Sequence, residues 1–277
     1  NIVDKFLIRK ETNHSELEVA MKCSQAYDLE YRRNIKTMSL LPETSYPLFF
    51  HNIMSEIISS LSGQRFIGKD SVTHIAYIIK QVMQEKNDET EKDINILCQN
   101  IMQKYYQNYN PFEDAIKVMI PGYLFDVHSN DYNQMLKYYG KGLQYHIMAI
   151  CYGSNLFNDI LRAEKENIIP LVEKTLRNII RENNVVMPFQ GIPDVAIIFP
   201  DKYVVYDYKS IPTTSKDTSI QKHISLNVVI QLTMYMGLSK ENIQNIYAEA
   251  IYVKDISIRN DNIKNEEKVI PVLANID

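Results

Sequence analysis

The stretch QGIPDVAIIFPDKYVVYDYKS, residues 190–210, restricts the possible folds of this chain more than any other part of it. Two runs rich in β-branched and aromatic residues, 194–199 and 203–209, lie on either side of a turn that contains Pro, Asp and Lys. This pattern is typical of a β-hairpin. Apolar residues occupy both alternating faces of the two runs, which indicates strands that are buried on both sides of a sheet.

Three charged residues interrupt this apolar hairpin: Asp194, Asp207 and Lys209. The turn predicts that Val195 pairs with Tyr206, and Asp194 then lies opposite Asp207. Opposed residues share one side of the sheet with β-carbons about 4.5–5.5 Å apart, and Lys209 joins that side two residues later. Buried charges are costly unless they are paired or bind a metal. The alternative is a turn residue, Asp194, and an exposed strand pair, but the apolar neighbours argue against solvent exposure.

Two opposed carboxylates beside an ammonium group suit a metal-dependent hydrolase. Mg²⁺ prefers hard oxygen ligands and usually takes one or two carboxylates, with water and phosphate oxygens completing its shell. Such a metal lowers the pKa of an attacking water, and a lysine ammonium orients that water or stabilises the developing charge on phosphate. We therefore expect phosphodiester hydrolysis that depends on Mg²⁺ or Mn²⁺, with Asp194, Asp207 and Lys209 as catalytic residues.

The rest of the chain predicts a helical half followed by a mixed α/β half. Apolar residues recur every three or four positions over much of 45–163, which is typical of amphipathic helices. Helices are expected from Pro47 to Leu61 with Gly63 as a stop, from Ser71, over 94–105, from Pro111, and over 130–161 with interruptions around Gly140, Gly142 and Gly153. Strands are expected at 171–180, 185–190, 194–199, 203–209, 246–253 and 268–273, with a helix at 226–238.

Composition narrows the class of protein. The chain has 277 residues, of which 45% are apolar, enough for a substantial core. Its net charge of −4 argues against coating nucleic acid by bulk electrostatics, so a DNA path must be a local patch. Three scattered cysteines, Cys23, Cys98 and Cys151, predict neither a disulfide framework nor a four-cysteine metal site.

The start of the chain, NIVDKFLIRKET, is too charged for a signal peptide, and no run of 18 apolar residues exists. Abundant Ile, Asn, Lys and Tyr without Trp fits A/T-rich coding. We expect a cytoplasmic protein of a bacterial or phage-infected cell that has no contact with membrane.

The hairpin residues resemble a known nuclease pattern. Pro193-Asp194 and Asp207-Tyr208-Lys209 resemble the PD and D-x-K elements of the PD-(D/E)XK nuclease superfamily. The resemblance implies a restriction-endonuclease-like fold: an α/β protein whose mixed β-sheet core is flanked by helices, here with a large helical N-terminal elaboration.

The helix after the D-x-K element carries a further signature. QLTMY at 231–235 resembles the Q-x-x-x-Y motif of the RecB/AddB-like branch, which includes RecB-type CRISPR-associated nucleases and phage exonucleases. Gln231 and Tyr235, at i and i+4, share one helix face, and the resemblance implies that both contact the DNA backbone. The alternative is a packed tyrosine beside an exposed glutamine.

The same resemblance implies further metal ligands. His51 in FFHNIMSEI matches the helix histidine of the branch, Glu173 in LVEKTL matches an acidic residue on its first core strand, and the backbone carbonyl of Tyr208 completes the set. A packed histidine and a surface carboxylate are the ordinary alternatives. NHSELEVAMKCSQAYDLEYRRNI resembles the opening segment of the branch, but Cys23 has no cysteine after Cys151 to pair with, so no iron–sulfur cluster is expected.

These expectations define a domain plan and a function. The plan has an N-terminal segment with the first core helix at 1–63, a helical insertion at 64–165 and the nuclease core at 166–277. The expected function is that of a metal-dependent deoxyribonuclease, an exonuclease that acts in replication, recombination, repair or phage DNA processing, with a helicase, ATPase or recombination protein as a possible partner. The alternatives are a catalytically silent DNA-binding or scaffold subunit of a helicase/ATPase complex and an RNA-directed nuclease.

Overall fold

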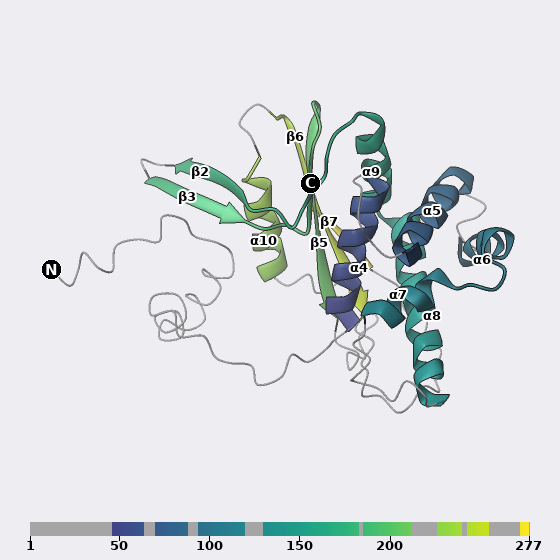
Figure 1. Cartoon of the computed structure of the whole chain (residues 1–277). Helices are drawn as coiled ribbons and strands as arrows, with labels where there is room; N and C mark the ends of the chain where they lie inside the picture. The colour runs from purple at the N-terminus through teal and green to yellow at the C-terminus, as the bar shows by residue number, and fades with distance from the viewer. Residues whose placement is uncertain are drawn as a thin grey trace.

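The chain folds as a mixed α/β protein in which a helical half packs against one face of a sheet (Figure 1). The computed structural model describes residues 46–63, 70–87, 94–119, 130–182, 185–211, 226–239, 243–254 and 272–276. The opening segment and Cys23, on which part of the family resemblance depends, lie outside these described residues.

The first half is helical, as the apolar periodicity predicts. Its helices are α4 (Tyr46–Leu61), α5 (Asp70–Glu85), α6 (Ile94–Tyr105), α7 (Pro111–Met119), α8 (Asn130–Gly153) and α9 (Leu156–Lys165). Gly63 follows α4 with φ +69°, a left-handed conformation that suits glycine after a helix end. None of the described helices is both long and apolar enough to span a membrane.

One predicted interruption is wrong, because α8 continues through Gly140 and Gly142. A β-carbon at Gly140 would lie 2.6 Å from Cγ and 2.9 Å from Cα of Glu113, near the start of α7. The glycine therefore permits close helix packing rather than breaking the helix. The break predicted at Gly153 is confirmed, since α8 ends there and α9 begins at Leu156.

The sheet has the strand order β1-β4-β5-β6-β7. Its strands are β1 (Leu171–Val172), β4 (Val195–Ile198), β5 (Lys202–Ile211), β6 (Asn245–Lys254) and β7 (Val272–Ile276). Only the central β5–β6 pair is parallel among these pairings, and α10 (Leu226–Met236) lies between its strands in the chain. Val195 pairs with Tyr206 and Ile197 with Val204, so the predicted hairpin register is confirmed.

The single strand predicted over 171–180 is two strands in two sheets. After β1, Glu173 adopts φ +48° and its backbone N–H donates to the carbonyl of Asp194 at 3.1 Å. This left-handed residue redirects the chain into β2 (Leu176–Glu182), which pairs with β3 (Val185–Gly191) as a separate hairpin. The last predicted strand is described only from Val272, where β7 begins, and its residues 268–271 lie outside the described residues.

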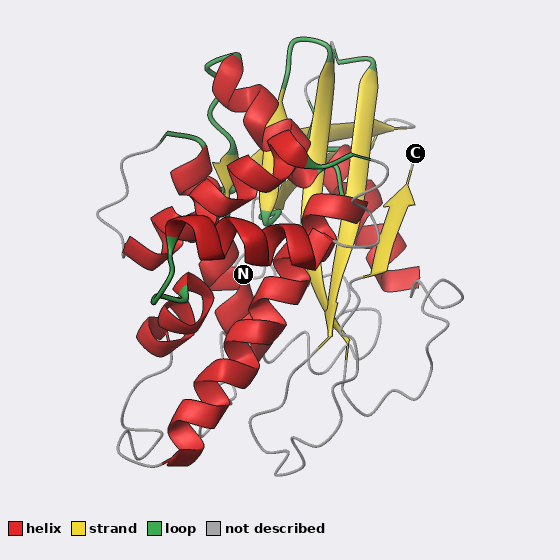
Figure 2. Ribbon diagram, turned by 90° about the vertical axis from the view of Figure 1, so that its right-hand side faces the viewer, coloured by secondary structure: helices red, strands yellow, loops and turns green. Residues whose placement is uncertain are grey.

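Two apolar cores enclose the β4–β5 hairpin. Val195, Ile197 and Tyr206 pack toward helices α4 to α9, whereas Ala196 and Val205 pack toward α10 on the other face. Figure 2 shows the helical layer in front of the strands. Burial of the hairpin on both faces and the mixed α/β class are therefore confirmed, while the domain limits at residues 63 and 165 stay a prediction.

Candidate active site

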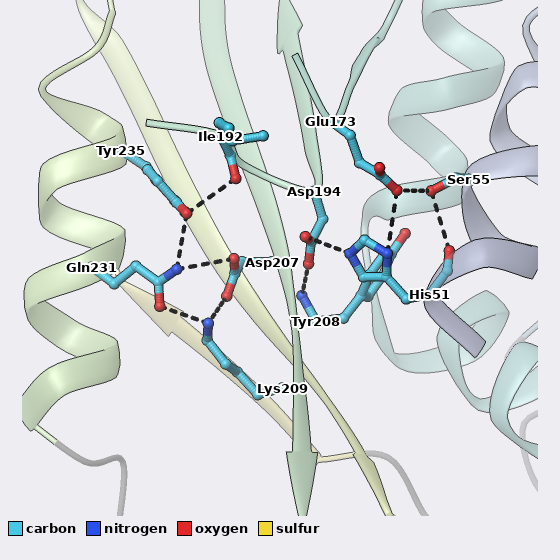
Figure 3. Close-up of polar contacts among 10 residues, drawn as sticks. All are labelled: His51, Ser55, Glu173, Ile192, Asp194, Asp207, Tyr208, Lys209, Gln231 and Tyr235. Atoms are coloured by element: carbon cyan, nitrogen blue, oxygen red, sulfur yellow. Dashed lines mark hydrogen bonds and ion pairs between the residues drawn. The ribbon is translucent and has the colours of Figure 1, made fainter. Parts of the chain in front are cut away.

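The site lies where the β4–β5 hairpin opens, between α4 on one side and α10 on the other (Figure 3). Asp194 directly precedes β4, and its Oδ2 accepts a hydrogen bond of 2.5 Å from the backbone N–H of Tyr208 on β5. The pairing register thus holds the Asp194 carboxylate against the strand that carries Asp207 and Lys209.

Asp207 is the most buried charged group of the site, with 3% of its surface exposed. Burial, and then the negative charge of Asp194, raises the pKa of Asp207 to about 6, against the opposing effect of Lys209. The Lys209 ammonium forms an ion pair with the Asp207 carboxylate. The structure therefore brings together Asp194, Asp207 and Lys209, the three residues that the hairpin register places on one side.

Helix α10 adds Gln231 and Tyr235 to this group. Lys209 Nζ donates to Gln231 Oε1 at 2.6 Å, and Gln231 Nε2 donates to the Tyr235 hydroxyl at 2.9 Å and more weakly to Asp207 Oδ1 at 3.4 Å. The Tyr235 hydroxyl donates in turn to the carbonyl of Ile192 at 3.1 Å. These bonds link the Asp207–Lys209 pair to the loop that precedes Asp194, and Tyr235 is buried.

His51 reaches the site from α4 and lies between two carboxylates. Its Nε2 is 2.7 Å from Asp194 Oδ1 and its Nδ1 is 3.2 Å from Glu173 Oε1. The hydrogen bond to Asp194 raises the pKa of His51 above its usual value, in spite of an opposing effect of burial. His51 thus contacts polar groups of the candidate site, and its role as a metal ligand stays a prediction.

Two contributors were not predicted from the sequence. Ser55 Oγ donates to Glu173 Oε1 at 2.6 Å, and the Ile192 carbonyl receives the Tyr235 hydroxyl. Ser55 follows His51 by four residues on α4, a spacing that places both side chains on one helix face and could have identified it. The role of Ile192 depends on its backbone, for which the side chain gives no signal.

The side chains present fit a divalent cation. Carboxylate oxygens suit Mg²⁺ or Mn²⁺, and the buried Asp207 carboxylate lies beside a second negative group whose charge a cation would offset. Within the described part of the chain, no three such side chains already surround a common point. His51 and Asp194 bond each other instead, so a cation held by both side chains requires that hydrogen bond to be given up.

Tyr208 contributes in two ways. Its backbone N–H fixes Asp194, and its ring packs edge-on against His51 with ring centroids 5.7 Å apart. The use of its carbonyl as a ligand stays a prediction, as do the DNA contacts of Gln231 and Tyr235.

Three comparisons relate this chain to known proteins. A family model described as the PD-(D/E)XK nuclease superfamily matches residues 11–274. A search of curated proteins finds none that matches the chain. Four chains of solved structures match; one, titled "Crystal structure of SSO0001", is 12% identical with a TM-score of 0.26, and the match covers 74% of this chain and 80% of that one.

Proposed function

Because the chain belongs to the PD-(D/E)XK nuclease superfamily, we propose that it is a Mg²⁺- or Mn²⁺-dependent deoxyribonuclease of the RecB/AddB-like branch. The proposed activity is that of an exonuclease that acts on DNA in replication, recombination, repair or phage DNA processing. The Q-x-x-x-Y residues Gln231 and Tyr235 support the branch, since both bond into the same network as Lys209.

The observation that carries the proposal is the buried Asp207–Lys209 pair beside Asp194. Like charges in a buried site destabilise the folded protein, so an arrangement that served stability alone would avoid them. Strongly perturbed carboxylates held by a specific partner are typical of active sites. A silent scaffold has no physical need for them.

We assign the cation to Asp194, Asp207 and His51, with the backbone carbonyl of Tyr208. When bound, Mg²⁺ or Mn²⁺ supplies a Lewis acid for the scissile phosphate and lowers the pKa of the attacking water. Lys209 Nζ, held by Asp207 and Gln231, donates to that water or to the negative charge that develops on phosphate. Gln231 thereby fixes the direction of the ammonium group.

Glu173 has a different part in this proposal from the ligand role that the sequence predicts. Its carboxylate lies at Nδ1 of His51, the nitrogen that faces away from Asp194. A carboxylate at that position fixes the tautomer and ring orientation of a ligating histidine. We therefore assign Glu173, with Ser55 behind it, to the orientation of His51.

The test uses end-labelled single- and double-stranded DNA and a covalently closed circle, each with Mg²⁺, Mn²⁺ or EDTA. We expect degradation from the ends of linear DNA with either metal, no degradation in EDTA and an intact circle. Asp194→Ala and Lys209→Ala should abolish cleavage. Cleavage of the circle would refute exonuclease action, and DNA binding without cleavage under every metal would favour the silent scaffold.

A further inference from the structure

The described side chains of the β2–β3 hairpin, at 176–179 and 188–191, form one set packed on the protein and one set that faces solvent. Arg177 pairs with Gln190 and Ile179 with Pro188, so these four residues share a side of the hairpin. We call them the outer hairpin face. Arg177, Ile179 and Pro188 are exposed, Ile179 to 47%, and Gln190 is partly exposed. Exposed apolar side chains that lie together beside a candidate site indicate a binding surface.

The opposite face fixes the hairpin to α10. Phe189 is fully buried there, and Asn178 Nδ2 donates to the carbonyls of Gly237 at 2.8 Å and Ser239 at 2.9 Å, just beyond the end of the helix. A β-carbon at Gly191 would lie 2.8 Å from the ring of Tyr235, so glycine allows the strand to approach this helix. The hairpin is thus positioned by the helix that also carries Gln231.

The outer hairpin face leads to the candidate active site. Strand β3 ends at Gly191, and Ile192, which is 55% exposed, follows it directly. The carbonyl of Ile192 is held by Tyr235, and Asp194 lies two residues further on (Figure 3). The chain from Pro188 to Ile192 extends about 13 Å at strand spacing. In Figure 1 the hairpin projects from the body of the protein beside α10.

We propose that the outer hairpin face and Ile192 bind a single-stranded segment of the DNA substrate and guide it to Asp194. The proposal rests on the proposed function. A duplex hides the faces of its bases and presents phosphates, whereas an unpaired strand exposes bases that apolar side chains can contact. The branched apolar groups of Ile179 and Ile192 suit bases, and the Arg177 guanidinium suits phosphate. A chain with net charge −4 needs such a local surface to hold DNA.

The test compares Ile179→Glu with Ile96→Glu, which changes an isoleucine of similar exposure, 51%, on α6. Fluorescence anisotropy measures binding of an oligothymidine strand and of a blunt duplex in Ca²⁺, which we expect to permit binding without turnover. Ile179→Glu should weaken binding of the single strand about tenfold or more, in line with the loss of base contacts. Binding of the duplex, and the single-strand affinity of Ile96→Glu, should stay within about twofold of wild type. Ile179→Ala, which adds no charge, should weaken single-strand binding in the same direction.

Hydrolysis of a small substrate distinguishes a defect in this surface from a defect in the catalytic centre. Hydrolysis of bis(p-nitrophenyl) phosphate with Mn²⁺ needs no hairpin contact, so Ile179→Glu should hydrolyse it at the wild-type rate. Equal single-strand affinity in Ile179→Glu and Ile96→Glu would refute the proposed binding surface without contradicting the nuclease proposal. Equal weakening of single strand and duplex would overturn the preference for unpaired bases. Wild-type protein that neither binds nor cleaves DNA would overturn the nuclease proposal and this surface together.

Discussion

At the scale of single residues, His51 contacts two carboxylates that both lie far from it in the chain. Asp194 lies at its Nε2 and Glu173 at its Nδ1. A cation bound at one ring nitrogen of His51 leaves only the other nitrogen for an orienting carboxylate. The proposed roles of Asp194 as ligand and Glu173 as orienting group therefore make different predictions for double variants.

We predict that His51→Ala and Glu173→Ala each weaken Mn²⁺ binding, Glu173→Ala by about tenfold, as is usual when an outer-shell partner is removed. If Glu173 acts through His51, the double variant should bind no more weakly than His51→Ala alone. Calorimetric titration of Mn²⁺ into the four proteins measures this. Additive losses in the double variant would instead make Glu173 a direct ligand.

A packed histidine provides the control for folding stability. His74 on α5 packs against Tyr106, with ring centroids 4.8 Å apart, and has no contact with the candidate site among the described interactions. His74→Ala should leave Mn²⁺ affinity unchanged and cost about 1–3 kcal/mol of folding stability. His51→Ala should show the reverse pattern, since both ring nitrogens of His51 face carboxylates of the candidate site. Unchanged Mn²⁺ affinity with lowered stability would remove His51 from the site.

At the scale of elements, the sequence predicted the local geometry of the hairpin. It did not predict the bend and the helix continuation that depend on tertiary packing. The turn length alone fixes the pairing of Val195 with Tyr206, and with it the approach of Asp194 to Asp207. The bend at Glu173 and the unbroken passage of α8 through Gly140 depend on contacts with Asp194 and Glu113, which lie far away in the chain. His51 and Asp194 are 143 positions apart, so only the family resemblance could place them together.

On helix α10, Gln231 and Tyr235 are compatible with two roles. The sequence predicts that Gln231 and Tyr235 contact DNA, yet in the folded protein they bond to Lys209 and to the Ile192 carbonyl. A positioning group changes the chemical step, whereas a substrate-binding group changes affinity. The two roles therefore separate in the kinetics of variants.

For Gln231→Ala we predict a fall in kcat of about tenfold to a hundredfold with little change in KM for DNA, because Lys209 loses the acceptor that directs it. Single-turnover cleavage in Mn²⁺ measures the chemical step. Thr233→Ala is the matched control, since Thr233 is exposed on the same helix and its hydroxyl donates to the carbonyl of Val229. A raised KM with unchanged kcat would support direct DNA contact by Gln231.

At the scale of the whole molecule, the site depends on how the helical half is packed against the sheet. The ring of Phe50, next to His51 on α4, lies edge-on to the Tyr208 ring on one side and to His146 of α8 on the other, with centroids 5.7 and 5.6 Å apart. A fully buried histidine therefore lies in the core against Phe50, the neighbour of His51. Burial lowers the pKa of His146 from 6.5 to about 3.

This burial predicts acid sensitivity of the whole fold. Between pH 3 and 6.5 the unfolded chain binds a proton at His146 that the folded protein excludes, so the stabilising effect is complete above pH 6.5 and is lost as the pH falls. For one such group the loss from pH 7 to pH 5 is about 2 kcal/mol. Urea unfolding of wild type and His146→Leu at both pH values measures the difference. The raised pKa of His51 changes the free energy of unfolding with pH in the opposite direction. This change is common to wild type and His146→Leu, so it cancels in the difference between them. Parallel pH dependence in the two proteins would show that the core around His146 opens to accept the proton without unfolding.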